Sequence, residues 1–212
     1  MKHTTSQTLY SYWNEVRDGR PAPRRFDIEP ARISHILSST LILERLDFET
    51  YRFRLAGTDV CDIFGYELRG EEFFPLWDEE GDRISFEKAL SAITRHCRLG
   101  VFEFAGEAPS GETITCEMLL MPLVHTNDQV DRCLGAISAA YSETRFNSEP
   151  LTNHRLLSSR MITPDANLEQ YVTPTEPQGP QAPAPFTADI RSARIVRSDR
   201  RQFRVYDGGL SD

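Results

Sequence analysis

Residues 55–70, LAGTDVCDIFGYELRG, decide the fold that the rest of the sequence must fit. Strand-like residues give way at Gly57 to a short apolar segment, which Thr58 or Asp59 can cap as the start of a helix. This helix has barely two turns, because Gly65 ends it, and a second glycine turn follows. The stretch holds no obvious catalytic group, so we interpret it as a compact structural unit.

Two strand signals lie immediately upstream of this unit. Residues 40–48 and 51–57 are separated only by Glu49 and Thr50, which predicts an antiparallel hairpin. Apolar and basic residues alternate in the second strand, in the order Tyr51, Arg52, Phe53, Arg54 and Leu55. This period of two is typical of a strand with one buried face, and it places Phe53 and Leu55 on the same side.

A longer helix and three further strands lie downstream. The apolar residues Phe86, Leu90, Ile93 and Cys97 recur at helical spacing, with Asp82 as the predicted cap and Gly100 as the predicted stop. Strand patterns then occupy residues 101–108, 113–123 and 132–141, with turn signals between them. The predicted order is two strands, helices, and three strands.

The N-terminal part of the chain predicts a helical extension. Leu9, Trp13 and Val16 recur at helical spacing between a possible cap at Ser6 and a stop at Gly19. A proline-rich connector follows, and Pro30 can begin a small helix.

The C-terminal part has a different composition. Residues 163–185 contain six prolines and few large apolar groups, which is typical of a linker. After the linker, residues 189–209 contain six arginines.

These features together resemble the PAS domain. The stretch from residue 55 to 82 looks like the central PAS signature, in which a strand, a small helix, FGY, LRG and an aromatic segment precede the long helix. Residues 9–37, LYSYWNEVRDGRPAPRRFDIEPARISHIL, resemble the opening of a bacterial PAS family common in alphaproteobacteria, in which YW...R.GR..P.R.DI.P precedes FRL.GT...FG.EL.G. The resemblance covers about residues 9–143.

The resemblance implies an α+β fold: a five-stranded antiparallel sheet with helices on one face, an N-terminal helical extension and a mostly irregular C-terminal tail. We therefore expect four regions along the chain. They are an N-terminal helical extension at 1–38, a PAS domain at 39–145, a Pro-rich linker at 146–185 and a basic C-terminal tail at 186–212.

Composition limits the class of function. The 24 lysines and arginines against 32 aspartates and glutamates give a net charge of −8, and all of that excess lies before residue 146, which argues against a nucleic-acid-binding face. We expect a cytoplasmic protein without a membrane span, because the N-terminus has no signal-peptide core and no run of about 18 apolar residues occurs. The four cysteines fit neither a disulfide framework nor a zinc site, and we interpret them as buried thiols.

The resemblance implies a signalling module that works by binding, with output through a partner protein or a homodimer. PAS domains commonly pair through a helix ahead of the sheet, which makes Leu9, Trp13 and Val16 the candidate dimer seam. The rival hypothesis is a ligand sensor with an internal pocket for an apolar metabolite or a nucleotide. Its candidate lining residues are Phe53, Leu55, Phe64, Trp77, Ile93, Phe104, Cys116 and Met118.

Cofactor and catalytic chemistry are the less favoured alternatives. PAS haem sensors use a histidine of the long helix, so His96 is the possible haem ligand, but its offset from the apolar stripe favours a position at the flank. Cys97 resembles the reactive cysteine of flavin-binding PAS domains only superficially, because it lies in the last turn of the long helix. Neither a metal loop nor a catalytic motif is present, so we predict no cofactor, no metal and no enzyme activity.

The basic tail is the candidate partner contact. Its charged and apolar residues are interspersed, which favours protein contact over a purely electrostatic arm. The residues that we expect to contribute are Arg194, Arg197, Arg200, Arg201, Phe203 and Arg204.

Overall fold

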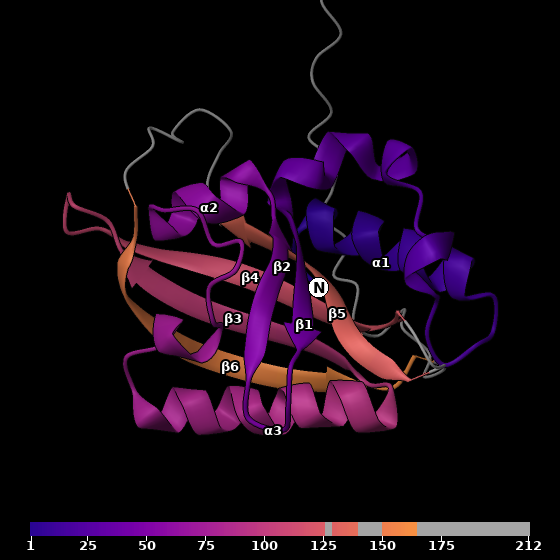
Figure 1. The fold of residues 1–212 in the computed structure, drawn as a ribbon. Helices are drawn as coiled ribbons and strands as arrows, with labels where there is room; N and C mark the ends of the chain where they lie inside the picture. The colour runs from indigo at the N-terminus through magenta and orange to yellow at the C-terminus, as the bar shows by residue number, and fades with distance from the viewer. Residues whose placement is uncertain (126–128, 140–149, 165–212) are drawn as a thin grey trace, which may run out of the picture. The chain divides into compact units, whose positions relative to one another are not determined.

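The computed structural model describes residues 1–125, 129–139 and 150–164. Its strands are β1 (Thr40–Arg45), β2 (Tyr51–Ala56), β3 (Leu99–Glu107), β4 (Thr113–Val124), β5 (Val130–Ala139) and β6 (Thr152–Ile162). Its helices are α1 (Thr4–Arg17), α2 (Thr58–Phe64) and α3 (Glu80–His96), with short 3₁₀ helices η1 (Arg25–Asp27), η2 (Pro30–Ser39) and η3 (Phe74–Leu76). The six strands form one antiparallel sheet in the order β2-β1-β5-β4-β3-β6 (Figure 1).

The five predicted strands and the β1–β2 hairpin are confirmed, and the sheet has one more strand than predicted. This sixth strand, β6, pairs with β3 at the edge of the sheet and lies inside the segment 146–185, which the sequence analysis interpreted as a linker. The linker interpretation is therefore wrong for residues 152–162. The cause is composition: β6 is mostly exposed, so it lacks the apolar alternation that identifies a strand.

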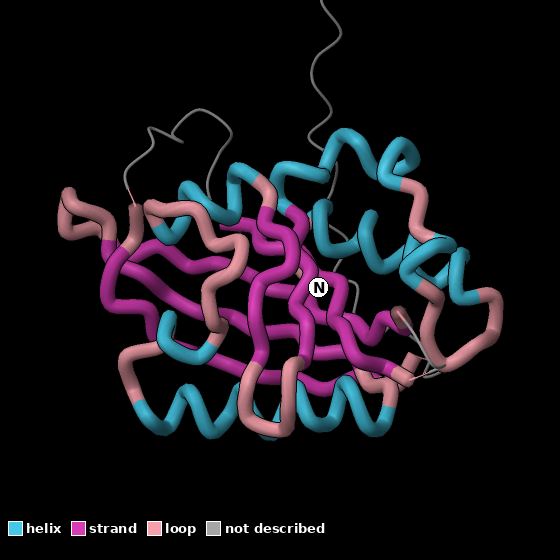
Figure 2. Tube along the Cα trace, viewed as in Figure 1, coloured by secondary structure: helices cyan, strands magenta, loops and turns pink. Residues whose placement is uncertain are grey.

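The sheet is covered on both faces rather than on one. Along β4, Cys116, Met118 and Leu120 belong to a core with α2, η3 and α3, which we call the inner core. The intervening Leu119 and Met121 belong to a second core with α1 and η2, the outer core. Alternate residues of a strand point to opposite faces, so the N-terminal extension covers the face that α2, η3 and α3 leave open (Figure 2).

The glycines of the opening stretch have separate structural reasons. A Cβ at Gly57 would lie 2.2 Å from the Ser38 carbonyl oxygen, so only glycine allows the start of α2 to approach η2. Gly65 ends α2 in the left-handed conformation at φ 83°, as predicted. The segment after Gly70 then runs beside β2, because the backbone N–H of Phe53 donates to Glu71 and that of Phe73 donates to Tyr51. The stretch therefore closes the β2 edge of the sheet.

Four predicted helix ends are displaced. The N-cap of α2 is Gly57, and neither Thr58 nor Asp59 caps this helix. Ser6 is not the cap of α1 but a buried residue inside it. Asp82 lies in the first turn of α3, two residues after its start, and its carboxylate accepts a hydrogen bond of 2.8 Å from a backbone N–H of β6. α3 ends at His96 and is capped by Cys97, which takes the left-handed conformation at φ 50°, so Gly100 already belongs to β3.

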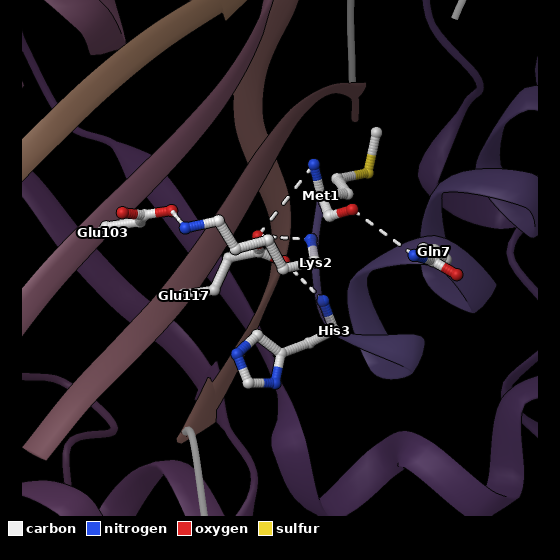
Figure 3. A network of polar contacts seen from close by, with 6 residues as sticks. All are labelled: Met1, Lys2, His3, Gln7, Glu103 and Glu117. Atoms are coloured by element: carbon white, nitrogen blue, oxygen red, sulfur yellow. Dashed lines mark hydrogen bonds and ion pairs between the residues drawn. The ribbon is translucent and has the colours of Figure 1, made fainter. Parts of the chain in front are cut away.

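A carboxylate from the sheet replaces the missing cap of α1. The Glu117 side chain is 2% exposed and accepts hydrogen bonds from the backbone N–H groups of Lys2, at 2.7 Å, and His3, at 3.3 Å (Figure 3). The Met1 ammonium lies 4.0 Å from the same carboxylate, and burial lowers the pKa of that ammonium. A negative charge is favourable at a helix N-terminus, so Glu117 fixes the position at which α1 begins on the outer face.

Replacing Glu117 with alanine should destabilise the fold, because it leaves partly buried N–H groups at the start of α1 without acceptors. We expect a loss of about 1–3 kcal/mol in the free energy of unfolding, measured by urea denaturation. Glu103→Ala is the matched control. It removes a carboxylate that pairs with the mostly exposed Lys2, and its cost should stay at about 1 kcal/mol or less. Equal unfolding midpoints for the two variants would contradict this role of Glu117.

Candidate functional site

Seven of the eight residues proposed to line a pocket come together in the inner core. Phe53, Phe64, Trp77, Ile93, Phe104, Cys116 and Met118 are all buried there. Their rings are in contact with one another and with neighbours: Trp77 lies 5.3 Å from Phe104 and 4.2 Å from Phe86 between ring centroids. Four hollows formed by described residues open elsewhere, and none of these four is lined by any of the seven.

Leu55 is the exception, and the prediction that it lines an internal pocket is wrong. The β1–β2 pairing shifts by one residue, so that Leu43 faces Phe53 while Ile42 faces Leu55, and Arg54 is the extra residue of a bulge. A shift of one residue moves every later side chain to the other face. Leu55 is therefore 38% exposed and lines a hollow of about 680 Å³ together with Ile42, a residue of the outer core.

A polar group that the sequence analysis missed lies among these inner-core rings. His154 of β6 is 8% exposed, and its ring centroid lies 4.7 Å from that of Phe64 and 6.3 Å from that of Trp77. Its Nε2 and the Trp77 Nε1 are both buried without a hydrogen-bond partner among the described residues. Because buried polar atoms are normally paired, these two atoms mark a polar spot within the aromatic packing that lacks partners among the described residues.

Burial controls the protonation of this histidine. It lowers the pKa of His154 from the ordinary value of 6.5, and the nearby Asp78 acts more weakly in the opposite direction. The folded chain therefore keeps the imidazole neutral at pH values at which an unfolded chain binds a proton. No sequence signal pointed to His154, because β6 itself was not predicted.

The residues proposed as a dimer seam pack within the chain. Leu9 and Trp13 are fully buried in the outer core, and the Trp13 indole N–H donates a 2.9 Å hydrogen bond to the Pro122 carbonyl oxygen of β4. Val16 is half-buried against the same core. The apolar stripe of α1 thus covers the sheet of its own chain, so in this conformation Leu9 and Trp13 have no free surface for a second copy.

The candidate cofactor residues lie away from the inner core. His96 is exposed at the end of α3, where it lines a shallow hollow with Arg98 and Thr163, and Cys97 packs against the outer core.

Burial raises the pKa of Cys116 and Cys133 to about 12, so these thiols stay protonated at neutral pH. Within residues 1–125, 129–139 and 150–164, no group of three or more metal-ligating side chains lies close enough to hold an ion.

The remaining predicted site lies outside the described residues. It comprises the candidate partner contacts Arg194, Arg197, Arg200, Arg201, Phe203 and Arg204. No helix in the described part of the chain is long and apolar enough to cross a membrane.

His154 should make the stability of the fold depend on pH. Its pKa is lower in the folded chain than in the unfolded chain, so its full contribution is present above about pH 6.5 and is lost as the pH falls below that value. The wild type should therefore lose more free energy of unfolding than His154→Leu between pH 7.5 and pH 5.5. His35→Leu, at an exposed histidine, should behave like the wild type. Identical pH profiles for the wild type and His154→Leu would contradict this assignment.

Comparison with known protein families agrees with this architecture. A search of curated proteins found no match to the chain. A family model described as a PAS domain matches residues 1–138, a range that includes the N-terminal extension and all but the last residue of β5. PAS domains are sensory and signalling modules. Because the match covers more than half of the sequence, the chain belongs to the PAS domain family.

Proposed function

We propose that this PAS protein acts as a signalling module by binding at its surface, with output through a partner protein or a second copy of the chain. The observation that carries this proposal is the packing of the described inner-core residues, in which the aromatic side chains proposed to line an internal pocket contact one another. Close-packed side chains leave no room for a ligand, whereas protein contact requires only surface. A cytoplasmic location and a bacterial origin belong to the proposal, supported by four free thiols and by the N-terminal motif respectively.

One specific observation favours the rival, a sensor with an internal ligand. The unpartnered Nε atoms of Trp77 and His154 would be satisfied by a small polar molecule held between them. These atoms come from two separate segments, because Trp77 follows η3 and His154 belongs to β6. The two hypotheses therefore differ in whether the inner core holds space beside these atoms.

Cys116→Leu tests that difference through stability. Cys116 is fully buried on the inner face of β4, and a leucine there needs additional volume. In a filled core the larger side chain should cost about 1–3 kcal/mol of unfolding free energy, measured by urea denaturation. Cys61→Leu is the control, because Cys61 is only half-buried on α2 and should change stability much less. A neutral or stabilising Cys116→Leu would show space in the inner core and contradict the proposal.

Native mass spectrometry of the purified full-length chain tests the proposal directly. We expect masses of the chain alone or of its oligomer, with no small molecule retained in stoichiometric amount. Light scattering on the same sample gives the oligomeric state. Because Leu9 and Trp13 are buried, any dimer should persist in Val16→Ser, which alters only the half-buried part of the α1 stripe. A stoichiometric adduct that survives desalting in the wild type and is lost in His154→Leu would instead support the internal sensor.

A further inference from the structure

The outer face carries a charged hollow next to the β2 edge of the sheet. Its volume of about 680 Å³ is in the range of small-molecule sites. Its walls come from η1, β1, β2, the segment after α2, and β5. The lining residues are Arg25, Phe26, Ile42, Arg54, Leu55, Ala56, Glu67, Arg69, His125 and Arg132.

Positive charge dominates this hollow although the chain is acidic overall. Four arginines line it against a single carboxylate, Glu67, which already accepts the backbone N–H of Arg69 at 2.9 Å. Among the described residues, the guanidinium groups of Arg25, Arg54 and Arg69 have no ion pair or hydrogen bond, and Arg54 and Arg69 are exposed. Like charges repel when they gather in one concave space, so an anion bound there would relieve the repulsion.

The fourth arginine gives the hollow a fixed wall. Arg132 is 8% exposed, and its Nη2 donates a 3.0 Å hydrogen bond to Glu44, which also pairs with Arg52 of the edge strand. These two arginines hold the pKa of Glu44 below its ordinary value, against the effect of burial. The Arg132 Nε and the His125 Nδ1 are buried and have no partner among the described residues. Hydrogen-bonding capacity is thus left unused in two side chains that line one hollow.

An exposed aromatic ring lies beside the arginines of this hollow. The side chain of Phe26 is 79% exposed, and its ring centroid lies 5.8 Å from that of His125. The segment that carries Phe26 is fixed to the sheet, because the Val124 N–H of β4 donates a 3.0 Å hydrogen bond to the Pro23 carbonyl oxygen. A large, exposed and positioned aromatic side chain provides a surface on which a planar group can stack.

We propose that this hollow binds a nucleotide, with the arginines on its phosphates and Phe26 against its base. Guanidinium groups bind phosphate oxygens through paired hydrogen bonds, and here they come from four separate segments around one concave space. That arrangement fits a compact polyanion better than an acidic peptide, which spreads its charges along a line. The hollow is on the outer side of the sheet, so this site is separate from the inner core in which a PAS ligand was expected.

Isothermal titration with ADP tests this site in the full-length chain, and adenosine and pyrophosphate serve as probes for its two halves. ADP should bind saturably at one site per chain, pyrophosphate should bind more weakly, and adenosine should not bind measurably. Arg54→Ala and Arg69→Ala should each weaken ADP binding by about tenfold or more. Neither guanidinium bonds to another described residue, so both variants should keep the melting temperature of the wild type.

The controls separate this site from general attraction to charge. Arg155→Ala removes the same charge from β6, at the opposite edge of the sheet, and should leave ADP binding unchanged. Phe26→Ala should weaken ADP without affecting pyrophosphate. The proposal is overturned if neither ADP nor GDP binds at millimolar concentration, if Arg54→Ala and Arg69→Ala bind ADP like the wild type, or if pyrophosphate binds as tightly as ADP. A glutamate-rich peptide that binds more tightly than ADP would overturn it in favour of a protein partner.

These outcomes are independent of the proposed surface-binding function. That function would be contradicted by a small molecule retained in the inner core, or by a Cys116→Leu variant that is as stable to urea as the wild type. The nucleotide site would be contradicted by outer-face variants, Arg54→Ala and Arg69→Ala, that bind ADP as tightly as the wild type.

Discussion

The central strands β3, β4 and β5 are apolar on both sides, and this constraint shapes the rest of the structure. Along β4, Met118 and Leu120 face the inner core while Leu119 and Met121 face the outer core. α3 and its neighbours cover one side only, so exposed apolar strand surface would remain without a second layer. α1 and η2 provide that layer, and Trp13 anchors it through both burial and its hydrogen bond to β4. The N-terminal extension is therefore part of the folded unit, and its apolar stripe is buried against the sheet of the same chain.

β6 completes the inner core from outside the region that the family model matches. It pairs with β3 along nearly its whole length, and the Asp82 carboxylate ties it to the first turn of α3. It approaches closely because Gly106 has no side chain: a Cβ there would lie 2.8 Å from that of Leu151. β6 also places His154 beside Phe64 and Trp77. The polar spot of the inner core thus depends on a segment that follows residues 1–138.

The sequence was informative where local pattern and tertiary burial agree. The short helix that stops at Gly65, the long helix and five strands all carried their own periodicity and are present. The apolar stripe of α1 was predicted correctly, but the stripe alone does not show whether it packs against a second chain or against the sheet of its own chain. The unbroken apolar run of β4 indicates the second, because a strand that is apolar on both faces needs a covering layer on each. β6 has mostly exposed residues, and its pairing comes from backbone hydrogen bonds that leave no pattern in the sequence. Glu117 is likewise unpredictable, because its partners are backbone groups about 115 positions away.

The β1–β2 bulge links the two faces of the molecule. Without the extra residue Arg54, strict alternation would place Leu55 in the inner core, as the sequence suggested. With it, Ala56 packs against the inner core instead, and both Arg54 and Leu55 line the hollow of the outer face. One inserted residue therefore places alanine instead of leucine against the inner core, while Arg54 and Leu55 add a charge and an apolar contact to the hollow of the outer face. Bulges commonly redirect a side chain in this way beside functional sites. We infer that the two faces have separate roles, with stability on the inner side and recognition at the β2 end of the outer side.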